Sequence, residues 1–208
     1  GIMGVRLKDW KSELLVPGRE NDLLFMLRTT REAVYSVTEP GPGEAADRPK
    51  TIYAVHVDTK KVRKLARIAA GGITASNADD SLLLGQVAYG AKPLQPKDPA
   101  SLAKFGNTEY AALGPDGKPL NFAKAKGVRM LERWSARVPA ELFTIDLKSG
   151  ERKVLYKTEE WIGHAQFSPT DPKLSRSCME GPWHRVDRIK LIQADGSGLR
   201  SVHTRTMN

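Results

Sequence analysis

The clearest structural signal in the sequence is the segment of residues 142–155, LFTIDLKSGERKVL. Apolar and polar residues alternate on both sides of a Lys-Ser-Gly turn, which is the pattern of a β-hairpin. Two other segments share this pattern: residues 52–65, IYAVHVDTKKVRKL, and residues 189–202, IKLIQADGSGLRSV. Their apolar positions stay in register at offsets of 90 and 47 residues. The hairpin is therefore a repeated unit.

A second repeated element precedes these hairpins. Residues 72–80, GITASNADD, come before the apolar stretch 82–88, and residues 163–171, GHAQFSPTD, occupy the same place before the third hairpin. Each unit predicts a strand, a Ser/Asn-x-x-Asp turn, a second strand and the hairpin. Four antiparallel strands in about 45 residues form a β-propeller blade. A β-sandwich does not repeat this order in register, so we predict an all-β chain of four-stranded antiparallel propeller blades.

The longer first offset predicts an insertion between blade strands, at residues 90–139. Its first part has the Pro and Gly content of a loop. Residues 122–137 have helical spacing, with Met130, Leu131 and Trp134 on the apolar side. A long excursion from a blade is expected to lie over the face of the disc, where loops often carry function.

The remaining length corresponds to about three and a half blades, fewer than the roughly four to eight of closed propellers. We therefore expect residues 1–208 to form a single partial propeller domain that is part of a longer protein. The free strand edges and blade faces of such a domain favour self-association.

Composition narrows the possible partners. The chain has 33 Lys and Arg against 24 Asp and Glu, a net charge of +9, which favours an acidic partner. The basic residues of segment 116–137 predict a solvated helix face or a surface that attracts anions. Nucleic acid is an unlikely partner because the sequence has no nucleic-acid-binding signature or aromatic platform. No apolar run approaches the roughly 18 residues of a membrane span. A single cysteine, Cys178, excludes an internal disulfide and is expected to be a buried strand thiol.

Two histidines are candidates for chemistry. His164 follows Gly163 on a predicted inner strand, where the blades converge, and Gln166 lies two residues further on the same side. A structural histidine is the alternative interpretation. His184 ends the turn Glu-Gly-Pro-Trp-His of residues 180–184, where packing of the Trp is the alternative. His56, inside an alternating strand, is expected to be packed or on the surface. No zinc-protease, P-loop, dinucleotide or nucleophile-elbow motif is present.

Residues 142–207 resemble the oligogalacturonate lyases. The resemblance rests on LFTIDLKSGE at 142–151, WIGHAQFSP at 161–169, CMEGPWHRVDRI at 178–189 and DGS at 195–197. It implies a seven-bladed propeller, of which about half the blades are present here. It also implies β-elimination of short oligogalacturonides from pectin, manganese as cofactor, and a cytoplasmic location that fits the lack of a visible signal peptide.

The resemblance also implies site residues. His164 matches the family's Gly-His position and is the expected base. Gln166 on the same strand, and Glu180, Trp183, His184 and Arg188 in or beside the matched turn, are expected to line the sugar site. No metal ligand is assigned, because the family's manganese ligands would follow residue 208.

Three departures from the family pattern weigh against activity. Met179 stands where the family turn has histidine, and Glu141 stands where an arginine is expected. The polar residues of Leu-Ser-Arg-Ser at 174–177 are expected to weaken that blade. The alternative function is therefore a non-catalytic propeller that binds acidic sugar or a protein partner.

Overall fold

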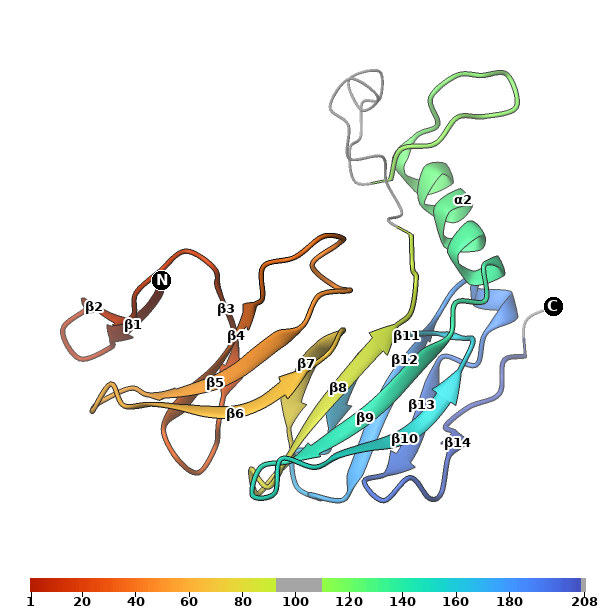
Figure 1. Ribbon diagram of the computed structural model, residues 1–208. Coiled ribbons are helices and arrows are strands. Elements are labelled where there is room, and N and C mark those ends of the chain that lie inside the picture. The colour runs from red at the N-terminus through yellow and green to blue at the C-terminus, as the bar shows by residue number, and fades with distance from the viewer. Residues whose placement is uncertain (93–109, 207–208) are drawn as a thin grey trace.

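The computed structural model describes residues 1–92 and 110–206. In this part of the chain the strands form one two-stranded sheet and three four-stranded antiparallel sheets, which confirms the all-β, blade-based prediction (Figure 1). The two-stranded sheet contains β1 (Ile2–Arg6) and β2 (Lys11–Val16). We name the four-stranded sheets the first, second and third blades.

The strands of each blade follow one another in sequence order. The first blade contains β3 (Asn21–Met26), β4 (Glu32–Thr38), β5 (Lys50–His56) and β6 (Val62–Ile68). The second contains β7 (Gly72–Ser76), β8 (Leu82–Ala88), β9 (Ala140–Asp146) and β10 (Arg152–Thr158). The third contains β11 (Trp161–Phe167), β12 (Leu174–Glu180), β13 (Ile189–Gln193) and β14 (Arg200–Ser201). The three predicted hairpins are thus β5–β6, β9–β10 and β13–β14.

The blades meet at their first strands, since β3 contacts β7 and β7 contacts β11. Apolar side chains fill the space between successive blades. Ile52, Leu83 and Phe143 belong to the cluster between the first and second blades, whereas Leu84 and Met179 belong to the cluster between the second and third. Leu83 and Leu84 are both fully buried. Because side chains alternate along a strand, β8 is covered on both faces.

The predicted Ser/Asn-x-x-Asp turns connect the first two strands of the second and third blades. In the second blade, Asn77 Oδ1 accepts hydrogen bonds from the backbone N–H groups of Ser81 and Leu82. In the third, Ser168 Oγ accepts from the N–H groups of Thr170 and Asp171. Side chains that cap backbone donors in this way are why these residue types recur at turns.

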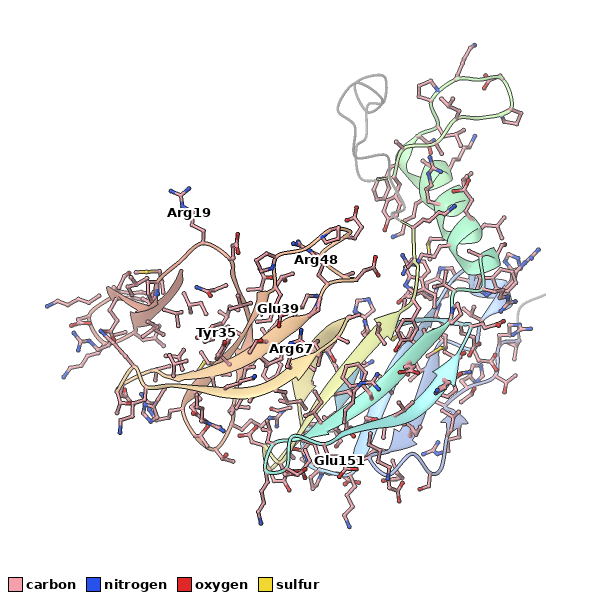
Figure 2. The ribbon with its side chains drawn as sticks, in the orientation of Figure 1. Arg19, Tyr35, Glu39, Arg48, Arg67 and Glu151 are labelled. Carbon is pink, nitrogen blue, oxygen red and sulfur yellow. The ribbon has the colours of Figure 1, made fainter. Side chains whose placement is uncertain are left out.

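Ion pairs bridge strands of the first blade. Arg67 of β6 donates to Glu39, just beyond β4, with Nε 2.7 Å from Oε1 (Figure 2). On the same two strands, Arg63 donates to Glu32 with both Nε and Nη2. Arg67 lowers the pKa of Glu39, and Arg63 lowers that of Glu32.

The predicted insertion contains helix α2 (Phe122–Ser135), which projects beyond the ends of the sheets (Figure 1). Asn121 caps it by accepting a hydrogen bond from the Lys124 N–H. Trp134 is half-buried as expected, but the placement of Leu131 on the apolar side is wrong, because its side chain is 42% exposed. The helix contacts the rest of the protein along a narrow stripe, from buried Ala125 to its last turn. Residues 93–109 of the insertion lie outside the described residues.

The polar residues of β12 do not interrupt the third blade. Each residue from Leu174 to Cys178 pairs with β13, and both ends of β12 pair with β11. Ser175 is buried and its hydroxyl donates to the carbonyl oxygen of Ile192 at 3.1 Å. Serine is tolerated at this buried position because its hydroxyl group has a hydrogen-bond acceptor. Among the described helices, none has the length and apolar character needed to cross a membrane.

Candidate functional site

The innermost strand of the third blade has an irregularity at the predicted base. Between Gly163 and Gln166 the pairing of β11 with β12 shifts register, and His164 adopts φ +48°, a conformation unusual for a residue other than glycine. A Cβ atom at Gly163 would lie 2.9 Å from Cγ of Glu180. The glycine therefore makes room for the carboxylate, and the bulge presents the imidazole, whose side chain is 75% exposed.

Four of the predicted site residues form one connected group. His164 Nε2 lies 3.6 Å from Oε1 of Glu180, whose side chain is only 17% exposed. Arg188 Nη1 donates to Oε2 of the same carboxylate at 3.0 Å, and its Nη2 donates to the Gly181 carbonyl oxygen. The Arg188 guanidinium lies 4.2 Å from the centroid of the Trp183 ring. We name His164, Glu180, Arg188 and Trp183 the histidine cluster.

Gln166 is hydrogen-bonded to Arg176, a residue that was not among the predicted site residues. Arg176 of β12 donates to Oε1 of Gln166 at 2.7 Å and has no carboxylate partner in the described chain. Arg176 and Glu180 are four residues apart on one strand, so they share a face. That spacing is a usable signal in the sequence, although the prediction for residues 174–177 concerned only the stability of the strand. Cys178, on the same face, is half-buried rather than buried as expected.

His184 does not join the histidine cluster. It lies on the short 3-10 helix η1 (Trp183–Arg185), is exposed, and its Nε2 accepts a hydrogen bond from Arg185 Nε. The same turn supports α2, because a Cβ atom at Gly181 would lie 2.7 Å from the Trp134 ring and Arg185 stacks over that ring. The Glu-Gly-Pro turn thus joins the helix to the cluster.

The structure gives two of the departures a structural explanation. Met179 is fully buried in the apolar cluster between the second and third blades, so its side chain points away from the histidine cluster. Glu141 of β9 accepts hydrogen bonds from Tyr89 and Arg152, and Lys157 lies 3.3 Å from its other carboxylate oxygen. Arg152 lowers the pKa of Glu141, so this carboxylate is neutralised within the sheet.

The described residues do not form a manganese site. Nowhere in residues 1–92 and 110–206 do three His, Cys, Asp or Glu side chains gather in a way that would hold an ion. The histidine cluster offers only one imidazole and one carboxylate, and that carboxylate already binds Arg188. What this arrangement can provide is a base, a carboxylate that orients it, and nearby guanidinium groups that bind anions.

Comparisons with known proteins agree with the sequence motifs. Residues 116–208 match the family model described as oligogalacturonate lyase. The chain is 36% identical over 88 residues to an oligogalacturonate lyase of Dickeya dadantii, and 32% identical over 88 residues to an oligogalacturonide lyase of Pectobacterium atrosepticum. Each alignment covers 42% of this chain and 22% of the relative.

Two solved structures share the fold over nearly the whole chain. An oligogalacturonate lyase in complex with manganese superposes with a TM-score of 0.68 at 21% identity, covering 98% of this chain and 46% of the relative. The lyase of Vibrio parahaemolyticus superposes with a TM-score of 0.65 at 19% identity, covering 97% and 45%. The chain therefore spans less than half the length of these relatives. Residues 116–208 are thus similar to the oligogalacturonate lyases, and the blades of the chain have the fold of two solved oligogalacturonate lyases.

Proposed function

We propose that the protein cleaves short oligogalacturonides by β-elimination, with His164 as the base. The observation that carries this proposal is the placement of His164 on the β11 bulge, exposed and 3.6 Å from the Glu180 carboxylate that Arg188 holds. The names of the relatives support the substrate class. A purely structural histidine would not need to be both exposed and in a strained backbone conformation.

In the proposed reaction the imidazole of His164 removes the proton from C5 of a galacturonate residue. The electron pair of the C5–H bond forms the C4–C5 double bond, the C4–O4 bond breaks, and the departing oxygen takes a proton from solvent. Glu180 stabilises the imidazolium that forms, because an anion close to a developing cation lowers the energy of that state. Arg188 is a positioning residue that holds the carboxylate.

The C5 proton becomes acidic when the neighbouring carboxylate of the substrate is neutralised. Arg176 suits this task, because within residues 1–92 and 110–206 its side chain hydrogen-bonds to the Gln166 amide oxygen and the Cys178 sulfur and to no carboxylate. Gln166 would orient the guanidinium toward the sugar. Manganese, which is present in one solved relative, is the cofactor that the resemblance implies for the whole protein; the described residues supply no site for it.

The direct test is formation of an unsaturated uronate from trigalacturonate, followed by its ultraviolet absorbance in the presence of manganese. We expect His164→Ala to lower kcat by about 10²–10⁴-fold, the usual contribution of a general base. His184→Ala removes an exposed imidazole two residues from the turn's glycine–proline pair and is the matched control, with activity near that of the parent. Added chelator tests the metal requirement separately.

Two results would contradict the proposal. His164→Ala could retain the activity of the parent, which would exclude this imidazole as the base. Alternatively, the parent protein could bind galacturonides saturably without forming any product. That second result would favour the non-catalytic sugar-binding alternative.

A further inference from the structure

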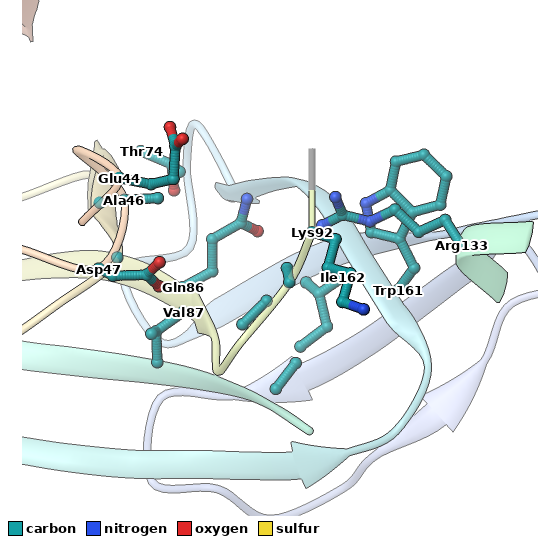
Figure 3. A pocket seen from close by; sticks show the side chains of 15 residues that line it. Glu44, Ala46, Asp47, Thr74, Gln86, Val87, Lys92, Arg133, Trp161 and Ile162 are labelled. Carbon is teal, nitrogen blue, oxygen red and sulfur yellow. The ribbon is translucent and has the colours of Figure 1, made fainter. Parts of the chain in front are cut away.

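A cavity of about 430 Å³ lies where β7, β8 and β11 approach α2 and the β4–β5 loop (Figure 3). Its volume falls within the range of about 300–1,000 Å³ typical of small-molecule sites. Cationic and aromatic side chains, Lys92, Arg133 and Trp161, line one wall. The carboxylates of Glu44 and Asp47 and the amide of Gln86 lie on the opposite wall, and Val87 and Ile162 add apolar surface.

Arg133 is the unusual residue of this cavity. Its guanidinium lies 4.6 Å from the centroid of the Trp161 ring, and no carboxylate of the described residues lies within ion-pair distance. Burial lowers the pKa of Arg133, with no opposing contribution from an anion. Other arginines of the protein, such as Arg63 and Arg152, bind carboxylates directly. A partly desolvated arginine without an anion favours an anionic ligand, because such a ligand restores the lost interaction.

The opposite wall offers hydrogen-bond acceptors. Gln86 Oε1 is buried and has no hydrogen-bond partner among the described residues, and the Asp47 carboxylate faces the cavity (Figure 3). A buried acceptor without a donor costs free energy until a donor reaches it. Sugar hydroxyl groups are such donors. A multiply charged phosphate would be repelled by Asp47, whereas a single planar carboxylate matches the guanidinium geometry.

We propose that this cavity is a subsite for one uronate residue of an acidic oligosaccharide. The carboxylate of the uronate binds Arg133 and Lys92, its hydroxyl groups donate to Gln86 and Asp47, and the apolar wall contacts the C–H face of the ring. The choice of ligand rests on the proposed function, whereas the cavity and its charges do not. Trp161 begins the strand that carries His164 three residues later, so a bound chain reaching both places would be held beside the base.

The test compares Arg133→Met with Arg137→Met by titration calorimetry, both in a His164→Ala background without added metal so that the ligand is not consumed. Arg137 is a matched control because it also stacks on a tryptophan, with its guanidinium 4.3 Å from the Trp134 ring, and does not line the cavity. The ligands are digalacturonate and the uncharged galactose disaccharide. Loss of a hydrogen-bonded charge pair corresponds to about tenfold to a hundredfold weaker binding.

We expect Arg133→Met to weaken digalacturonate binding by that factor, Arg137→Met to leave it unchanged, and the neutral disaccharide to show no difference between the variants. Equal digalacturonate affinity of the two variants, or no binding to either the background protein or its variants, would overturn the subsite. Binding that depends on Arg133 in a protein that never forms unsaturated product would support the subsite and refute the lyase proposal. If the parent protein cleaves the substrate and Arg133→Met does so with an unchanged KM, the subsite proposal is refuted and the lyase proposal stands.

Discussion

The second and third blades have the same strand order but different second strands. β8 of the second blade reads LLLGQVA, and Leu83 and Leu84 on its two faces are both fully buried. β12 of the third blade reads LSRSCME, and its residues alternate between buried and partly exposed. In the described chain the second blade lies between two others, whereas the third is covered on one face. The face of β12 that no described blade covers carries Arg176 and Glu180, whereas both faces of β8 carry buried apolar side chains.

The largest expected loss of stability comes from a substitution in the apolar interface between the first and second blades. Phe143 of β9 is buried between the first and second blades, and its ring closely approaches Gly85. Phe143→Ala should lower the free energy of unfolding by about 3–5 kcal/mol, because it removes a large buried side chain and leaves a cavity. Chemical denaturation measures this loss.

Ile189→Ala on the third blade is the matched control, because Ile189 is 37% exposed on the uncovered side of β13. We expect this substitution to lower the free energy of unfolding by less than about 1 kcal/mol, because little apolar surface is buried there. A cost equal to that of Phe143→Ala would mean that another part of the protein or a second copy covers this face.

The next effect concerns a polar link between the two blades. Lys190 of β13 donates to Glu160 and to the Tyr156 hydroxyl of β10. Burial opposes the charged form of Lys190, but the hydrogen bonds to Glu160 and Tyr156 outweigh it and raise the pKa. A raised pKa stabilises the fold below the unfolded-state value of about 10.4, and this contribution is lost as the pH rises through the higher folded-state value.

Lys190→Met should therefore lower the free energy of unfolding by about 1–2 kcal/mol at neutral pH. The difference in unfolding free energy between parent and variant should stay constant from pH 6 to 9 in denaturation experiments and shrink at more alkaline pH. A difference that instead disappears on acidification to pH 6 would assign the link to some other titrating group.

The strained backbone of the third blade's inner strand gives a smaller effect. His164 has φ +48°, a conformation that costs a residue with a Cβ atom about 1–2 kcal/mol. His164→Gly should be more stable than His164→Ala by about 1 kcal/mol, because only glycine relieves the strain. Both variants should lack the proposed base, so we expect both to be inactive although their stabilities differ. If alanine proves the more stable variant in thermal unfolding, the bulge is not strained.

The smallest effect tests the buried hydroxyl of β12. Ser175→Ala removes the hydrogen bond to the Ile192 carbonyl oxygen and should cost about 0.5–1 kcal/mol. Cys178→Ala changes the partly exposed side of the same strand and should cost less, which makes it the control. Greater stability of Ser175→Ala than of the parent would revive the expectation that the serines weaken the blade.

Much of the candidate site follows from local sequence. The order Gly-His, then Glu-Gly-Pro-Trp, then Arg placed His164, Glu180, Trp183 and Arg188 on two paired strands and the turn that follows them. Paired strands bring such residues together regardless of the remaining fold. His184 was grouped with them because it is adjacent in sequence, but the 3-10 turn points it toward Arg185 instead. Arg176 was missed because its contact with Gln166 depends on the register between β11 and β12, which shifts at a bulge that the sequence pattern does not reveal.

The repeats, the hairpin register and the turn residues are properties of short segments, and period-2 alternation with local capping is sufficient to specify them. The sequence alone therefore established the second and third blades and the hairpin of the first, but not β3 and β4. The packing of one blade and one helix against another decided whether Met179 was a site residue or a core residue. The same packing decided whether Arg133 was a solvated charge or part of a cavity wall. Burial and desolvation arise between segments distant in sequence, and no local pattern records them.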